Sequence, residues 1–317
     1  MDAAQLSWIA AVAGAERARR GERIQSRWSG YGEIFRVELS GAEVPSVIVK
    51  WVEPPARSRA DDASHRRKVR SYHVETAWYR TLARQCDDAS RVPRLIDAKV
   101  AGDRWLLVLE DLDAAGFAER RHRPKPAEID LCLAWLAAFH GRFLGAAPEG
   151  LWRTGTYWHL ATRPDELAII GDAALREAAP LLDRRLRSAT FQTIVHGDAK
   201  SANFCFARGG RAVAAVDFQY VGGGCGMKDV AYLLASPDAG AAQVEHRHLD
   251  GYFTHLRAAV AARGEAFDVA ALEREWRALY PIACADYYRF LAGWAPGHWR
   301  GEAHGQRVVR EVLRTLS

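Results

Sequence analysis

The chain has 317 residues, of which 49% are hydrophobic and 26% charged, and it contains no long polar or low-complexity tract. This length and composition predict an ordered globular protein of one large or two closely packed domains, and they exclude extensive disorder. The five cysteines are scattered without a C-x-x-C pair, which excludes a zinc ribbon or a disulfide framework and favours a reducing cytoplasm. The chain has no run of about 18 apolar residues, so we expect no membrane partner.

The net charge of +5 is compatible with nucleic-acid binding. However, the basic clusters at 17–23, 66–70 and 120–123 lie far apart and alternate with acidic residues. Such clusters are typical of solvated helix faces. We therefore expect no nucleic-acid partner, and strongly salt-dependent binding to DNA or RNA would contradict this expectation.

In chain order, residues 1–20 predict a short amphipathic helix. Residues 22–52 alternate between apolar and polar side chains around short Gly-containing turns, which predicts three antiparallel strands. Residues 62–84 carry apolar side chains every three to four positions, so one long helix follows the third strand. Two more strands around a Gly-Asp turn are expected over residues 92–112.

Farther along the chain helical patterns predominate, as in residues 126–143. Only two short strand-like runs interrupt them, at 192–196 and 212–218. The predicted fold class is α+β, in two lobes. A small five-stranded antiparallel sheet and one helix occupy residues 1–112, and a larger, mainly helical lobe occupies residues 113–317.

The segment HGDAKSANF, His196 to Phe204, carries the strongest chemical signal and is followed by AAVDFQ with Asp217. Asp198 and Asn203 are five positions apart, and Asp217 comes 14 positions after Asn203. This combination suits phosphoryl transfer, because the enzyme mainly supplies positioning, cations and a proton acceptor. One carboxylate would face the nucleophile and the other would hold a metal ion.

These residues resemble the catalytic segment of the aminoglycoside phosphotransferase and choline kinase superfamily. The resemblance implies a two-lobed protein-kinase-like fold with ATP and Mg²⁺ as cofactors. It implies that Asp198 orients the acceptor hydroxyl and takes its proton, and that Lys200 reaches the γ-phosphate. Asn203 and Asp217 would ligate Mg²⁺, which prefers carboxylate and amide oxygens.

Lys50 ends the third predicted strand, where kinase-like enzymes hold the α- and β-phosphates. Glu75, in the following helix, resembles the glutamate that pairs with this lysine. The alternative for Lys50 alone is a solvated strand-end lysine, and for Glu75 a surface partner one helical turn away.

The loop between the first two strands contains Ser29, Gly30 and Gly32, and it stands where the superfamily has a phosphate-covering loop. An ordinary hairpin turn looks similar, so this match depends on its place before Lys50. At the expected hinge, Glu110 and Leu112 mark the segment whose backbone would receive the adenine edge.

Three further polar residues are interpreted as supports rather than catalytic groups. Asp229 begins a helix after the proposed metal-binding aspartate, so we expect it to be structural, either as an N-terminal helix residue or as a brace for the catalytic loop. His140 and His196 are expected to be hydrogen-bonded supports, because Asp198 already provides a proton acceptor.

The motifs are H-G-D and D-F-Q rather than H-R-D and D-F-G, and no A-P-E segment follows. A small-molecule hydroxyl acceptor is therefore preferred over a peptide. The hinge and D-F-Q resemble the ecdysteroid-kinase-like and choline-kinase-like branch. Cationic aminoglycosides need a strongly acidic pocket, whereas the stretch ACADYYRFLAGWAPGHW is aromatic and aliphatic with few acids. We therefore expect a less charged, ring-bearing or choline-like acceptor. The aromatic residues near the carboxyl end either line its pocket or form core: Tyr287, Tyr288, Trp294 and Trp299.

The alternative functions are a catalytically weak nucleotide-binding scaffold and a protein-kinase-like regulator. We expect a monomer or a weak homodimer. The kinase hypothesis depends on the convergence of the lysine, glutamate, asparagine and two aspartates around magnesium-bound triphosphate.

Overall fold

The computed structural model describes residues 1–26, 31–54, 63–235, 242–264 and 267–316. The chain divides into two compact units, each built from segments that are distant in sequence. Unit 1 comprises Met1–Asp87, Arg91–Arg120 and Cys205–Val216. Unit 2 comprises Asp88–Ser90, Arg121–Phe204 and Asp217–Ser317.

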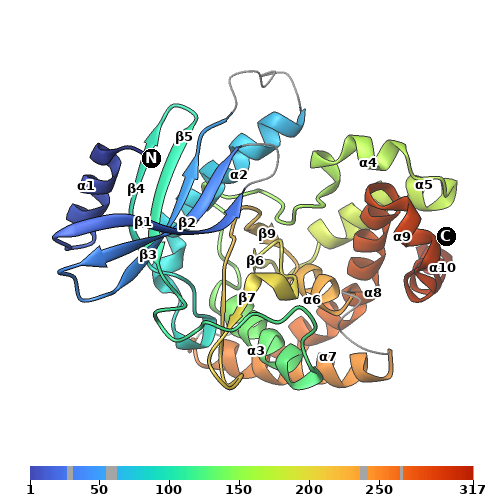
Figure 1. Ribbon diagram of the computed structural model, residues 1–317. Helices are drawn as coiled ribbons and strands as arrows, with labels where there is room; N and C mark the ends of the chain where they lie inside the picture. Colours follow the sequence, from blue (N-terminus) through green and yellow to red (C-terminus); the bar gives the residue numbers. More distant parts are fainter. Residues whose placement is uncertain (27–30, 55–62, 236–241, 265–266, 317) are drawn as a thin grey trace. The chain divides into compact units, whose positions relative to one another are not determined.

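Unit 1 is built on a five-stranded antiparallel sheet, which confirms the prediction (Figure 1). Its strands lie in the order β1-β2-β3-β5-β4. Short connections place successive strands beside one another, except that helix α2 separates β3 from β4 in the chain. The bounds are β1 Arg17–Ser26, β2 Gly32–Ser40, β3 Ser46–Val52, β4 Leu95–Ala101, β5 Arg104–Glu110 and α2 Ala63–Arg80.

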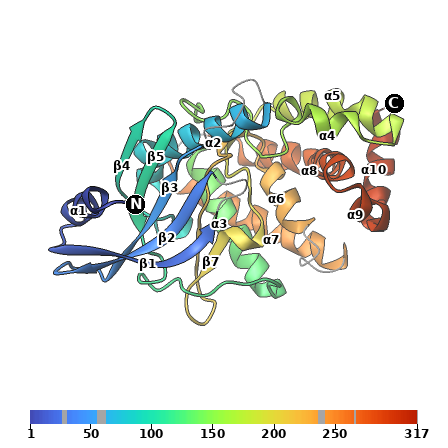
Figure 2. The ribbon, with the colours of Figure 1, turned by 45° about the horizontal axis from the view of Figure 1, so that its top comes forward.

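The two faces of this sheet pack against different elements. Successive side chains of a strand point to opposite faces, and Val47 and Val49 of β3 belong to an apolar cluster that also contains Ile9. Ile9 comes from helix α1, Ala3–Val12, which covers this face (Figures 1 and 2). Lys50 points to the opposite face, where α2 supplies its partner.

A polar network fixes the end of β5. The Asp111 carboxylate is 3% exposed and accepts from Ser46 Oγ at 2.7 Å and from Arg36 Nε at 2.6 Å. Arg36 Nη2 also donates to Asp113 Oδ2 at 2.6 Å. Burial would raise the pKa of Asp111, but the Arg36 and Ser46 hydrogen bonds hold it below its usual value. The segment predicted as a hinge is therefore anchored to β2 and β3.

The hairpin of β7, Phe204–Phe206, and β8, Val213–Ala215, was not expected to join the sheet-bearing part of the chain. Leu112 packs with Cys205 and Ala214 in a small apolar cluster, which explains why Cys205–Val216 belongs to unit 1. The lobe boundary after residue 112 stays a prediction.

Unit 2 is mainly helical, as predicted, with one two-stranded antiparallel pair of β6 and β9. Helix α3 lies along α7, and the long helix α8 contacts α5, α6 and α10 (Figures 1 and 2). The bounds are α3 Pro126–Arg142, α4 Pro164–Ala168, α5 Ala173–Arg187, β6 Thr193–Val195, β9 Gly222–Gly224, α6 Met227–Leu234, α7 Ala242–Ala261, α8 Val269–Trp294, α9 Pro296–Gly301 and α10 Ala303–Leu316.

In the described part of the chain, every helix falls short of the combined length and apolarity that crossing a bilayer requires.

Candidate active site

The catalytic loop predicted at His196 to Phe204 leaves β6 through a turn that only glycine can form. Gly197 has φ of +82°, and a Cβ at this position would lie 2.0 Å from the backbone oxygen of Tyr220. Both the positive φ and the close approach exclude a larger residue. This turn places Asp198 immediately after the strand.

The two oxygens of the Asp198 carboxylate have different surroundings. Oδ2 accepts from Lys200 Nζ at 2.9 Å and from Asn203 Nδ2 at 2.9 Å. Asp198 is only 7% exposed, and its Oδ1 is buried without a hydrogen-bond partner among the described residues. A buried carboxylate oxygen without a donor is costly. Of the two oxygens, Oδ1 is therefore the one that lacks a donor within the described part of the chain.

Burial raises the pKa of Asp198, the nearby Asp217 charge raises it further, and Lys200 opposes both effects without cancelling them. For Lys200, burial lowers the pKa, but the Asp198 carboxylate outweighs burial and leaves the pKa raised. The ammonium therefore stays charged beside the carboxylate, while 43% of the Lys200 side chain remains exposed.

The residues predicted to hold Mg²⁺ present suitable atoms. Asn203 uses its amide nitrogen on Asp198, at 2.7 Å from the backbone oxygen and 2.9 Å from Oδ2, so its amide oxygen points elsewhere. Asp217 follows β8 in the left-handed region, with φ of +70°, and its charge acts on both Asp198 and Lys200. An amide oxygen and a carboxylate are hard donors that fit Mg²⁺.

Within the described ranges, no group of three or more His, Cys, Asp or Glu side chains could hold a metal ion. A magnesium ion at Asn203 and Asp217 would therefore need further oxygen ligands from phosphate and water, which is how this ion is usually bound beside nucleotides.

Asp229 at the start of α6 braces the loop, which confirms its interpretation as a support. It is fully buried and accepts from the backbone N–H groups of His196 at 2.6 Å and Gly197 at 2.9 Å. His140 Nε2 lies 3.1 Å from the same carboxylate, and His140 Nδ1 lies 2.9 Å from the Tyr252 hydroxyl. His196 Nδ1 accepts from the Asp198 backbone N–H at 3.2 Å, and its ring packs against aromatic side chains, so both histidines are hydrogen-bonded supports, as predicted.

In unit 1, Lys50 Nζ donates to Glu75 Oε1. Both residues are buried, with exposed fractions of 6% and 2%. Charged residues are rarely buried unless paired, so the alternatives of a solvated lysine and a surface glutamate are excluded. The contact is the one that the resemblance implied, whereas its role toward a nucleotide stays a prediction.

Of the predicted loop residues, Ser29 and Gly30 lie outside the described residues. Gly32 begins β2 with φ of +147°, and a Cβ there would lie 2.0 Å from the Trp51 backbone oxygen. The pairing of β2 with β3 therefore requires this glycine, whatever its role toward phosphate.

At the end of β5, the Glu110 carboxylate accepts from Arg91 Nη2 and, at 3.0 Å, from the Arg94 backbone N–H. Leu112 is 4% exposed. These side chains have structural partners, whereas the role of their backbone toward a nucleotide stays a prediction.

The sequence motifs missed the residues that surround Asp198 from other segments. The Tyr157 backbone N–H donates to the Gly197 oxygen at 3.0 Å. The Tyr157 and Tyr232 rings lie 5.8 Å apart. Burial and the charge of Asp198 raise the pKa of both tyrosines, so their hydroxyls stay neutral. Their aromatic character alone could not distinguish them from core residues.

The structure thus groups the predicted residues within each unit. Unit 2 brings together Asp198, Lys200, Asn203 and Asp217. Lys50 and Glu75 meet in unit 1. The convergence of both groups around one nucleotide stays a prediction.

A small sheet with a buried lysine–glutamate pair, and a helical unit with an aspartate–lysine–asparagine loop, define the protein-kinase-like class of fold. The family model described as the phosphotransferase enzyme family matches residues 35–279, and the chain belongs to this family. No curated protein sequence matches the chain.

Solved structures support the same fold. A candidate fructosamine-3-kinase from Thermobifida fusca YX-ER1 has a TM-score of 0.55 at 18% identity, covering 96% of this chain and 98% of that one. An ethanolamine kinase from Plasmodium vivax has a TM-score of 0.51 at 14% identity, covering 94% of this chain and 83% of that one. The fold and the superfamily are confirmed, whereas the ecdysteroid-kinase-like branch stays a prediction.

Proposed function

We propose that this protein transfers the γ-phosphoryl group of MgATP to a hydroxyl group of a small molecule. One observation carries the proposal. Asp198 holds one carboxylate oxygen on Lys200 and Asn203 and leaves the other buried without a partner. This arrangement suits a general base, because one oxygen can fix its orientation while the second accepts the proton.

In this proposal Asp198 Oδ1 accepts the proton of the acceptor hydroxyl and orients its oxygen for in-line attack. Lys200 offsets negative charge on the γ-phosphoryl oxygens. Asn203 and Asp217 hold Mg²⁺, which when bound would offset the charge that spreads over the phosphate oxygens. Asp229 keeps the loop in place through its two backbone contacts.

Nucleotide binding is assigned to unit 1. Lys50 would contact the α- and β-phosphates, and Glu75 would hold the lysine in position. The backbone at Glu110 and Leu112 would receive the adenine edge. The loop of Ser29, Gly30 and Gly32 would cover the phosphates.

Membership in the phosphotransferase enzyme family supports transfer of a phosphoryl group. The structures of similar fold include proteins named as fructosamine and ethanolamine kinases, whose names denote small acceptors. We extend this acceptor size, and a cytoplasmic location, to the present chain as part of the proposal.

The proposal can be tested with purified full-length protein in two steps. Calorimetry first measures ATP binding with and without Mg²⁺, for the unchanged protein and for Asp217→Ala. We expect Mg²⁺-dependent binding that Asp217→Ala removes. A library of hydroxyl compounds is then screened for ADP release, with mass spectrometry to detect a phosphorylated product.

Tight MgATP binding without transfer to any library member, and without ATP hydrolysis, would favour the scaffold alternative. Phosphorylation of peptides in preference to small molecules would favour the regulator alternative. Absence of MgATP binding would refute the proposal as a whole.

A further inference from the structure

We infer that the acceptor binds against Tyr157, Tyr232 and Tyr287 beside Asp198, and that it is an uncharged hydroxylated ring compound. The inference rests on the proposed function and adds the acceptor's chemical class. It follows from four features of unit 2: the turn that carries Tyr157, the tyrosine hydroxyls, the pairing of nearby charges and an exposed aromatic side chain.

The turn before Tyr157 is held in a strained conformation. Thr156 has φ of +96°, which is a genuine outlier for a β-branched residue. Its N–H donates to the Tyr220 oxygen at 3.1 Å, and the next N–H, of Tyr157, donates to Gly197. The Thr156 hydroxyl is buried without a partner among the described residues. Strain of this kind persists where the surroundings enforce it, often at ligand sites.

Three tyrosines lie close enough to Asp198 for its charge to raise the pKa of each. The Tyr232 ring lies 5.8 Å from Tyr157 and 5.0 Å from Tyr287. The pKa of Tyr287 rises to about 12 through burial, a nearby glutamate and the charge of Asp198. The Tyr157 and Tyr232 hydroxyls interact with each other through a side-chain hydrogen bond, and a neutral hydroxyl that already makes one hydrogen bond can still accept another. They therefore suit the hydroxyl and ether oxygens of a ligand better than its ammonium groups, which only donate.

The carboxylates near these tyrosines are already engaged. Glu166 Oε1 accepts from Arg163 at 3.0 Å. Asp286 lies 3.5 Å from Lys228 and 2.8 Å from Arg289, and all three are buried. A carboxylate that is already paired with two cations gains little from binding a third. The ion pairs therefore provide no binding site for a polycation.

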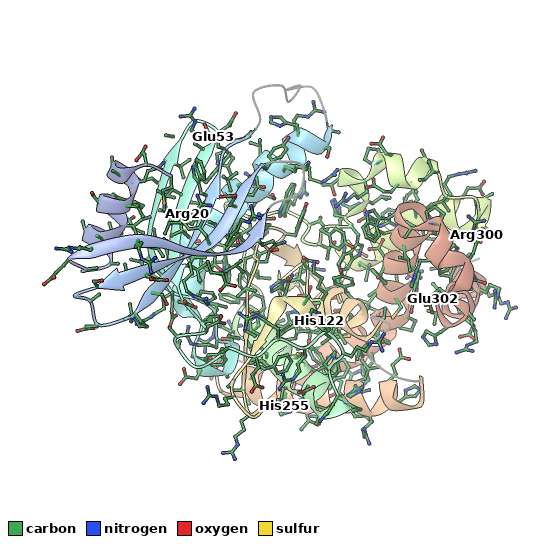
Figure 3. All side chains as sticks on the ribbon, viewed as in Figure 1. Arg20, Glu53, His122, His255, Arg300 and Glu302 are labelled. Carbon is green, nitrogen blue, oxygen red and sulfur yellow. The ribbon has the colours of Figure 1, made fainter. Side chains whose placement is uncertain are left out.

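Glu302 is the exception. It lies at the junction of α9 and α10 (Figure 3), acts on the pKa of Tyr287, and has no ion-pair partner among the described residues. Its Oε1 accepts from the Gly305 backbone N–H at 3.2 Å. A single carboxylate could hold one amine, so amine-bearing acceptors form the competing class in the test.

An exposed aromatic side chain continues the cluster. The Tyr157 ring lies 5.1 Å from Phe290, and Phe290 stacks on Trp294 at 5.8 Å and 20°. Trp294 is 56% exposed, whereas Tyr287 and Tyr288 are buried. Trp294 can stack on the apolar face of a ring whose hydroxyl reaches Asp198.

The test uses pairs of compounds that differ by one amino-for-hydroxyl replacement, such as glucose and glucosamine, together with cyclitols, aryl glucosides and choline. MgATP binding is measured first, so that failure of the proposed function is recognised separately. We expect the neutral member of a pair to have about ten-fold or higher kcat/KM, because buried hydroxyl partners discriminate strongly. Preference for the amine, or transfer to no neutral ring despite MgATP binding, would overturn the inference.

Two variants test the site directly. Tyr232→Phe should raise the acceptor KM about five- to ten-fold, the effect of one hydrogen bond, with the KM for MgATP unchanged. Tyr280→Phe is the matched control, because its hydroxyl in α8 donates to Glu245 at 2.5 Å. Trp294→Ala should raise KM for aryl glucosides more than for glucose. Equal acceptor KM values for Tyr232→Phe and Tyr280→Phe would contradict the assigned site, and melting temperatures would verify that both variants are folded.

Discussion

Replacing Asp198 by asparagine separates the chemical role of this residue from its structural role. To keep the contacts with Lys200 and Asn203, which both donate to Oδ2, the new amide oxygen must occupy the Oδ2 position. The amide nitrogen then occupies the position of the unpartnered Oδ1. A nitrogen that carries two hydrogens donates and cannot accept a proton. The variant therefore loses the base and keeps the loop.

The expected loss follows from this geometry. General base catalysis contributes about 10² to 10⁴ in rate, which is about 3 to 5 kcal/mol of transition-state free energy. Asp198→Asn should lose this factor in kcat with an unchanged Kd for MgATP. Asp198→Ala also frees Lys200 and Asn203, so it should lose a similar factor and weaken MgATP binding a few-fold.

The assay couples ADP release to a spectrophotometric readout, with acceptor at saturation and enzyme purified from a host strain free of contaminating kinase activity. Calorimetry gives the Kd for MgATP of each variant. The assigned base would be refuted if Asp198→Asn kept more than about a tenth of kcat, because that loss lies below the range for a general base.

Three further predictions concern stability. Asp229→Ala leaves two buried backbone N–H groups without their acceptor, so the free energy of unfolding should fall by about 2 to 6 kcal/mol; a loss under 1 kcal/mol in denaturant titration would contradict the brace. Gly197→Ala should lower Tm far more than Gly209→Ala. Both glycines have positive φ, but only Gly197 lies against a backbone oxygen. Equal decreases in Tm would contradict the close approach of that oxygen to Gly197. Asp111→Asn should destabilise by about 1.5 to 3 kcal/mol at pH 7. Burial raises the pKa of Asp111, but Arg36 and Ser46 outweigh burial and hold it below its usual 3.8. The difference in unfolding free energy between the unchanged protein and Asp111→Asn should therefore narrow as pH falls below about 4. A difference that widens in acid would refute this prediction.

The catalytic loop was predictable because its contacts are local. Asp198, Lys200 and Asn203 lie within six positions, and their mutual hydrogen bonds follow from one short turn of chain. The lysine–glutamate pair was implied by the resemblance to the superfamily, and the structure shows the contact between Lys50 and Glu75.

Long-range contacts were not predictable from spacing. Tyr157 precedes the loop by about forty positions and reaches it only through the backbone contact with Gly197. The hairpin Cys205–Val216 directly follows the loop in sequence yet belongs to unit 1, because Leu112 offers it an apolar surface. Gly32 was interpreted through its motif, while the structure gives it a second reason in strand pairing.

Backbone strain adds information that composition could not. Among the described residues, Thr156 and Asp217 are the two non-glycine residues with positive φ. Aspartate adopts a positive φ more often than most residues, whereas for the β-branched threonine it is an outlier. Asp217 acts electrostatically on Asp198, and Thr156 leads into the tyrosine that contacts the same loop. The two strained positions therefore lie on different segments that act on or contact the same loop. Strained backbone costs stability, persists only where the surrounding structure enforces it, and clusters at active sites. Two strained positions beside one loop therefore favour a pre-organised site around Asp198. The proposed metal ligand lies on one segment and the proposed acceptor contacts on the other.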